Sequence, residues 1–173
     1  MKEMIRKICM LGDPAVGKTS LVRRFVLDVF DDQYIPSIGM KVTKKQVHLK
    51  SENLDVTIMI WDILGSKTSR FDSVYYKGVK GALLVSDVTR ENTVDSIPKW
   101  IDGLYEITGK VPVFFLANKT DLVETSESFL KKMDKYCGEY NAKTLNTSAK
   151  TGDNVELAFY HLAKGMIKHK GEE

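Results

Sequence analysis

Residues 5–26 have the sequence IRKICMLGDPAVGKTSLVRRFV, and this stretch decides the fold. An apolar segment at residues 5–11 stops at Gly12, and the apolar residues that resume at Leu21 have the spacing of one helical face. The pattern G-x-x-x-x-G-K-[ST] fills the junction, where a loop that holds phosphate needs a strand before it and a helix after it. The stretch therefore predicts a strand, a phosphate-binding loop and a helix in succession.

Strand and helix patterns alternate along the rest of the chain. Residues 41–50 and 54–61 have strand patterns and are separated by Ser51-Glu52-Asn53, which favours a hairpin with a short loop. Continuous apolar runs at residues 81–88 and 111–117 are typical of strands buried on both faces of a parallel sheet. We expect an α/β fold with a mainly parallel sheet, one antiparallel hairpin and helices on both faces.

The same patterns predict three details of the helices. Arg23 and Arg24 are expected on the side of the first helix opposite its apolar stripe. Pro98 interrupts the helix expected at residues 93–107, so that this helix starts late or bends. Asp153, with a glutamate three residues later, has the spacing of a capping box at the start of the last helix.

Length and composition exclude several classes of protein. The 173 residues suit one domain, residues 1–173, and 43% hydrophobic with 28% charged residues is typical of a globular chain. A net charge of +3 is too balanced to predict a nucleic-acid surface. The apolar runs are far shorter than the roughly 20 residues of a membrane span, and the N-terminal residues lack the pattern of a signal peptide. We therefore expect a cytoplasmic protein with no integral membrane segment.

The loop after the first strand is the candidate phosphate site. Its backbone N–H groups would converge on phosphate oxygens, helped by the positive end of the following helix. Lys18 would reach the β- and γ-phosphates, and the Thr19 hydroxyl would bind Mg²⁺. Asp62 ends an apolar strand at residues 56–62 and would supply the carboxylate that such a metal needs. The predicted phosphate contacts are Asp13, Pro14, Ala15, Val16, Gly17, Lys18, Thr19 and Ser20.

A second set of motifs indicates which base accompanies the phosphates. Asn118-Lys119-Thr120-Asp121 directly follows a buried strand, and Thr147-Ser148-Ala149-Lys150 follows another strand-like run. The Asp121 carboxylate can accept hydrogen bonds from N1–H and the N2 amine of guanine, a donor pair that adenine lacks. The predicted base-binding residues are Asn118, Lys119, Asp121, Ser148, Ala149 and Lys150.

Three neighbours of Asp121 have supporting roles in this interpretation. Asn118 can tie the surrounding loops together, and the Lys119 stem can cover one face of the base. The Ala149 N–H can donate to guanine O6. An ATP-using kinase would not need the pair Asn118 and Asp121, so the motifs favour a guanine nucleotide.

In this order, the motifs resemble those of Ras-like small GTPases over the whole chain, and the Rab branch most closely. The Rab resemblance depends on Trp61-Asp62, Tyr34-x-x-Ser37-Ile38-Gly39, Tyr76-Lys77-Gly78 and Asp87-Val88-Thr89. It implies a P-loop fold with a six-stranded sheet, binding of GTP, GDP and Mg²⁺, and two switch segments that respond to the γ-phosphate. By position, the resemblance places Phe30 and Tyr34 at the nucleotide, and Ser37 at Mg²⁺ and the γ-phosphate.

The second switch departs from the family pattern. Gly65, a predicted nucleotide contact, is followed by Ser66-Lys67-Thr68-Ser69-Arg70, and no glutamine precedes Tyr76. Family members usually have a glutamine here that orients the attacking water, and a serine side chain is two heavy atoms shorter. The segment is about one residue shorter than usual, which leaves the positional equivalence of Ser66 open. We expect slow GTP hydrolysis, and the resemblance implies as catalytic residues Lys18, Ser37, Gly65 and Ser66.

The resemblance implies a GTP-operated switch that binds an effector when GTP orders the two switch segments. Its partners would be an effector, an exchange factor and an activating protein, and the chain would act as a monomer without nucleic acid. The missing glutamine leaves open a second hypothesis, a guanine-nucleotide-binding scaffold with negligible hydrolysis. The last cysteine is Cys137, so we expect membrane attachment only if a lipidated tail is missing from this chain.

Overall fold

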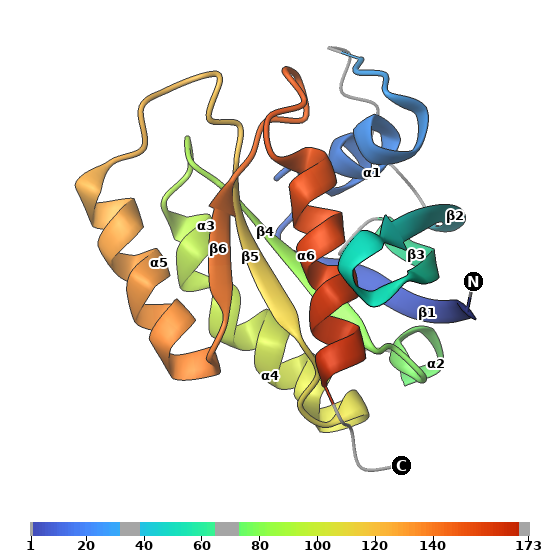
Figure 1. Cartoon of the computed structure of the whole chain (residues 1–173). Coiled ribbons are helices and arrows are strands. Elements are labelled where there is room, and N and C mark those ends of the chain that lie inside the picture. Colours follow the sequence, from blue (N-terminus) through green and yellow to red (C-terminus); the bar gives the residue numbers. More distant parts are fainter. Residues whose placement is uncertain (1, 32–38, 65–72, 170–173) are drawn as a thin grey trace.

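Six strands form a single sheet in the computed structural model, which describes residues 2–31, 39–64 and 73–169 (Figure 1). The order in space is β2-β3-β1-β4-β5-β6. β2 and β3 are antiparallel, and every other neighbouring pair is parallel, which confirms the predicted α/β fold with one antiparallel hairpin. The strands are β1 (Lys2–Leu11), β2 (Gly39–Leu49), β3 (Leu54–Leu64), β4 (Gly81–Asp87), β5 (Val113–Asn118) and β6 (Lys143–Asn146).

Strand β1 shows why the central strands are apolar without interruption. Ile8 and Met10 are buried on one face of the sheet, and Cys9 and Leu11 are buried on the other, because successive side chains of a strand point to opposite faces. Helices α1 and α6 cover the first face, and α2, α3, α4 and α5 cover the second (Figure 1). The helices are α1 (Lys18–Leu27), α2 (Ser73–Tyr76), α3 (Asn92–Asp95), α4 (Ile97–Thr108), α5 (Glu127–Tyr140) and α6 (Val155–Lys168), with a 3₁₀ turn, η1 (Lys50–Glu52), in the hairpin.

The helix boundaries confirm one sequence prediction and correct another. Pro98 lies in the first turn of α4, so the helix starts late, as expected. The capping box predicted at Asp153 is wrong. Asn154 is the N-cap of α6, with φ 56° and no side-chain cap, and its Nδ2 donates instead to the Asn146 carbonyl at 2.7 Å. Asp153 belongs to the preceding loop, where its carbonyl accepts the Ser148 N–H at 3.2 Å.

The sheet order places the candidate site at the carboxyl ends of the central strands. From β1 the chain passes to β2 and β3 on one side of β1 and then to β4 on the other. Ligands of open α/β sheets bind outside the carboxyl ends of the strands at such a reversal. The phosphate loop begins at this point, directly after Leu11. Among the described residues, no helix combines the length and the apolar composition needed to cross a membrane.

Candidate functional site

Two glycines let the phosphate loop approach the ends of the neighbouring strands. Gly12 has φ +133°, and a Cβ there would lie 2.3 Å from the backbone oxygen of Val85. Gly17 has φ +107°, and a Cβ there would lie 2.3 Å from Nδ2 of Asn118. Both the conformation and the available space therefore require glycine. The loop packs directly on β4 and on the end of β5.

The loop surrounds the ammonium group of Lys18. Nζ of Lys18 donates to the carbonyls of Gly12 at 2.7 Å and Asp13 at 2.9 Å. Burial lowers the pKa of Lys18 to about 8, although the charges of Asp62 and Asp13 oppose this shift. Among the described residues, no side chain caps the start of α1 at Gly17. Its first-turn N–H groups, which include that of Ser20, are the donors that a phosphate accepts at a helix start.

Thr19 and Asp62 meet beside this lysine. The Thr19 hydroxyl donates to Oδ2 of Asp62 at 2.7 Å, although the residues are 43 positions apart. Oδ1 of Asp62 is buried and has no hydrogen-bond partner in the described part of the chain. Burial raises the pKa of Asp62, and the Thr19 hydrogen bond and the Lys18 charge offset this only in part. A cation beside Oδ1 would supply the missing partner, and the oxygen donors suit Mg²⁺.

The outer side of the phosphate loop is held by residues that the motifs did not indicate. Asp13 accepts hydrogen bonds from the Ser96 hydroxyl at 2.7 Å and from Nε1 of Trp100 at 2.9 Å, both on the α3 and α4 side. The Pro14 carbonyl accepts from Nη2 of Arg90 at 2.8 Å. These contacts span 76 to 87 positions, so no local sequence pattern could have predicted them.

Asn118 joins the phosphate loop to the loop after β6. Its side chain is 1% exposed, donates to the Val16 carbonyl at 3.0 Å and accepts the Thr147 hydroxyl at 3.1 Å. Lys119, in the left-handed conformation with φ +69°, extends its ammonium to the Ala15 carbonyl at 2.8 Å. The predicted linking role of Asn118 therefore corresponds to two defined hydrogen bonds.

The two base motifs, residues 118–121 and 147–150, together form what we call the base segment. They meet at Asp121. Oδ1 of Asp121 accepts the Ser148 hydroxyl at 2.6 Å, and Ser148 itself is buried. Asp121 itself is exposed at the surface of the loop. Ala149 is buried next to Ser148, and Lys150 follows at the surface. The structure thus brings the two predicted base motifs together.

Arg24, expected on the side of α1 opposite its apolar stripe, is covered by another loop. Its side chain is 17% exposed, and its guanidinium donates to the carbonyls of Ala149 and Lys150. The physical reason is that the loop after β6 returns across this side of the helix. Phe30 is half-buried and packs against the core that α1 shares with α6. The remaining predicted contacts lie outside the described residues: Tyr34, Ser37, Gly65 and Ser66.

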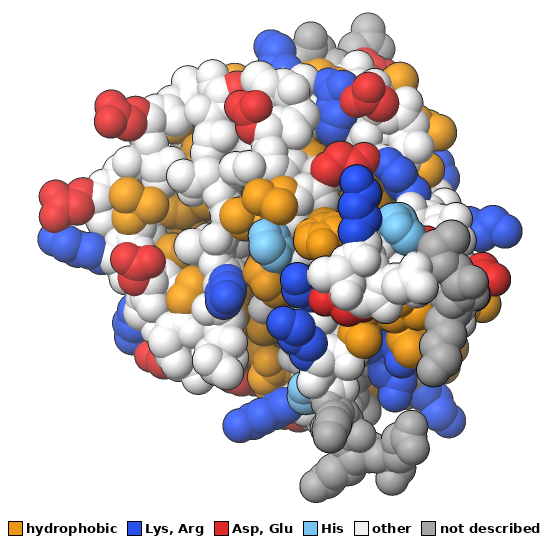
Figure 2. Space-filling model, in the orientation of Figure 1, with side chains coloured by type: hydrophobic (Ala, Val, Ile, Leu, Met, Phe, Trp, Pro, Cys, Tyr) orange, Lys and Arg blue, Asp and Glu red, His pale blue; other side chains and the backbone are white. Residues whose placement is uncertain are grey.

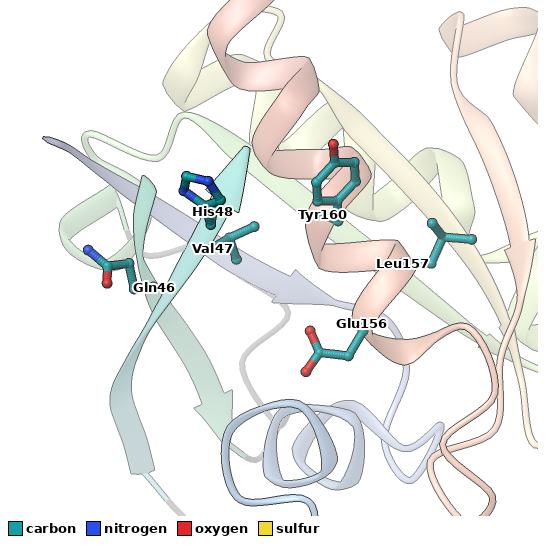
Figure 3. Close-up of a pocket in the computed structure, with 6 residues that line it drawn as sticks. All are labelled: Gln46, Val47, His48, Glu156, Leu157 and Tyr160. Carbon is teal, nitrogen blue, oxygen red and sulfur yellow. The ribbon is translucent and has the colours of Figure 1, made fainter. Parts of the chain in front are cut away.

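A surface groove lies away from these loops. It measures about 440 Å³ and opens between β2 and α6 (Figure 3). None of the residues that line it is a predicted nucleotide contact. The lining consists of Gln46, Val47, His48, Glu156, Leu157 and Tyr160. Basic and acidic side chains are intermingled over the face of the molecule seen in Figure 2. The nucleotide candidate is therefore defined by converging loops and hydrogen bonds rather than by this groove.

Comparisons with known proteins match almost the whole chain. The model of the Ras family matches residues 7–168. Ras-related protein Rab-8B from Homo sapiens is 34% identical over 163 residues, which cover 93% of this chain and 78% of that protein. Ras-related protein Rab-8A from Bos taurus is 34% identical over 162 residues, which cover 92% of this chain and 77% of the relative. Ras-related protein Rab-8 from Diplobatis ommata is 34% identical over 163 residues, which cover 93% of this chain and 77% of that protein.

Proposed function

The chain belongs to the Ras family, in its Rab branch, and we propose that it is a GTP-binding switch with slow hydrolysis whose effector surface depends on the bound nucleotide. Family membership supports GTP binding and GTPase activity in general. The observation that carries the proposal for this chain is the buried Asn118 side chain, which bonds both Val16 and Thr147. One side chain thereby couples the phosphate loop to the base segment.

The proposed nucleotide contacts follow the geometry of the loops. The N–H groups of the phosphate loop and Lys18 would hold the phosphates. Exchange of the two carbonyl partners of Lys18 for negatively charged phosphate oxygens would raise the pKa of its ammonium group. Asp121 would accept from the guanine edge, the Ala149 N–H would donate to O6, and the Lys119 stem would cover a base face. Phe30 would contact the base from the segment that follows α1.

Thr19 and Asp62 are the described residues that would hold Mg²⁺, together with Ser37 in the proposal. No group of three or more His, Cys, Asp or Glu side chains in the described ranges could hold a metal without further ligands. The metal would therefore depend on the phosphate oxygens of the nucleotide, as expected for Mg²⁺ in phosphoryl-transfer sites. When bound, Mg²⁺ would neutralise charge between the β- and γ-phosphates.

Removal of the metal tests this assignment. We expect EDTA to speed GDP release from the unmodified protein by at least roughly tenfold, because the contacts of Mg²⁺ with the phosphates are lost. Asp62→Ala should release GDP quickly both with and without EDTA. Asp55→Ala, on the same strand but bonded to His48, is the control and should respond to EDTA like the unmodified protein. A strong EDTA response that survives in Asp62→Ala would contradict the assignment.

Slow hydrolysis is proposed because the second switch lacks a water-orienting glutamine. In single-turnover experiments with pre-bound GTP, we expect a rate at least roughly tenfold below that of a glutamine-bearing family member. Ser66→Gln should raise the rate of this chain, and the neighbouring Ser69→Gln should not. A rate typical of glutamine-bearing relatives would refute the proposal.

The scaffold with negligible hydrolysis is the second candidate, and the same missing glutamine favours it. Trp61 separates the two because it directly precedes Asp62 and lies under the Lys7 ammonium, 3.5 Å from its ring centroid. A switch predicts different Trp61 emission with GDP and with a non-hydrolysable GTP analogue, obtained as the difference between the unmodified chain and Trp61→Phe, which keeps the Trp100 contact with Asp13. A scaffold predicts identical emission and no GTP turnover by chromatography.

The proposed partners are those of a nucleotide switch. An effector would bind the ordered switch segments, an exchange factor would open the site, and an activating protein would speed hydrolysis. Pro14 fixes the backbone where an activating arginine would approach, and its carbonyl already accepts from Arg90. We propose that the chain acts as a monomer in the cytoplasm.

A further inference from the structure

Arg24 connects the helix after the phosphate loop to the base segment. Its Nε donates to the Ala149 carbonyl at 2.8 Å, and its Nη2 donates to the Lys150 carbonyl at 2.6 Å. Its Nη1 donates to the carbonyl of Asp28 at 3.2 Å and to its carboxylate at 3.1 Å. Every nitrogen of the guanidinium is therefore engaged, and the side chain is held in one orientation.

The two carbonyls that Arg24 holds determine the direction of nearby N–H groups. The Ala149 carbonyl and the Lys150 N–H belong to one planar trans peptide and point in opposite directions. On the other side of Ala149, the Ser148 hydroxyl donates to Asp121 at 2.6 Å. The Ala149 N–H belongs to the preceding peptide, so Arg24 constrains it only through the Ala149 residue, which lies between the Ser148 contact with Asp121 and the carbonyls that Arg24 holds.

The turn after Lys150 also packs on the Arg24 stem. A Cβ on Gly152, which has φ +87°, would lie 3.7 Å from Cδ of Arg24. The Gly152 N–H donates to the Ser148 carbonyl at 2.9 Å, so the turn closes on itself directly over the arginine. A lysine at position 24 would carry the charge but not the planar fork that reaches two carbonyls at once.

We propose that Arg24 is a positioning residue for guanine recognition, holding the backbone of Ala149 and Lys150 so that its N–H groups face O6 of the base. This inference depends on the proposed function, because it assumes that guanine lies beside Asp121. In this role Arg24 does not need to contact the nucleotide. It acts through the peptide that it fixes, and it joins the phosphate half of the site to the base half.

The test compares nucleotides that differ at the base edge. Dissociation constants are measured for the unmodified chain and for Arg24→Ala with GDP, with inosine diphosphate, which keeps O6, and with 2-aminopurine riboside diphosphate, which lacks O6. We expect Arg24→Ala to weaken GDP and inosine diphosphate by a similar factor, roughly tenfold, because both need the O6 contact. The 2-aminopurine nucleotide should change by less than about twofold. The dissociation constant of Arg24→Lys for GDP should lie between those of the unmodified chain and Arg24→Ala.

Arg23→Ala is the matched control. Arg23 is the preceding residue of α1, and it pairs with Asp31 only at 4.0 Å on an exposed surface. This variant should bind all three nucleotides like the unmodified protein. Equal weakening of the three nucleotides by Arg24→Ala would show a general effect on α1 and would overturn the inference, as would unchanged GDP binding. If the unmodified chain binds GDP no better than ADP, the proposed function itself fails.

Discussion

Replacement of Asp121 by asparagine is expected to move the nucleotide preference from guanine to xanthine. The carboxylate offers acceptors to both N1–H and the N2 amine of guanine, whereas an amide would set one donor against the N2 amine. Xanthine has a carbonyl at this position and would accept from that amide donor. We expect GDP affinity to fall by roughly 100-fold or more and xanthosine diphosphate to become the tighter ligand, measured by competition against a fluorescent nucleotide.

Asp153→Asn is the control for this change. Asp153 is exposed in the loop before α6, and the structure uses its backbone groups rather than its side chain to hold Ser148 and Thr151. The same loss of charge there should leave GDP affinity within about twofold. An Asp121→Asn protein that still prefers GDP over xanthosine diphosphate would contradict the assignment of this carboxylate.

Asn118→Ala is expected to produce the largest loss of stability in the site. The Asn118 side chain is buried and makes one bond to Val16 and one to Thr147, both of which are also fully buried. The substitution leaves a carbonyl and a hydroxyl without their partner, which costs about 1–3 kcal/mol for each group. We expect the free energy of unfolding of the GDP-bound protein to fall by about 3–5 kcal/mol, measured by urea denaturation.

Asn146→Ala supplies the comparison, because Asn146 is exposed at the end of β6 and its contact with Asn154 is made by its backbone carbonyl, which the substitution keeps. The same truncation there should change the free energy of unfolding by less than about 0.5 kcal/mol. Asn118→Ala should also release GDP faster, because it uncouples the two loops, whereas Asn146→Ala should not. Equal losses in the two variants would mean that Asn118 does not couple the loops.

The parts of the fold and site with short-range signals were predictable. The phosphate loop, the hairpin and the late start of α4 each follow from spacing or from a residue with restricted backbone angles, such as Pro98. The strands buried on both faces were indicated by continuous apolar runs, because a covered sheet leaves no polar side.

The remaining features depend on which distant segments meet, and spacing alone does not encode that. The position of Arg24 on its helix does not indicate that it is covered. The loop after β6 covers it, and that loop is more than 120 positions away in the sequence. Trp100 has no sequence signal that links its indole to Asp13, 87 positions earlier. Asp153 has the spacing of a cap, but the left-handed Asn154 ends the loop one residue later. Tertiary contacts overrode local preference in each case.

The long-range hydrogen bonds on the outer side of the phosphate loop affect the order of folding. Asp13 and Pro14 are held by Trp100, Ser96 and Arg90 across 76 to 87 positions, and the next residue is held by Lys119 across 104. A loop shaped by such remote contacts cannot form until much of the chain has collapsed, because each closure must first lose chain entropy. The segment that comes early in the sequence is thus completed late, and a nucleotide that binds only the completed loop stabilises the whole domain by mass action.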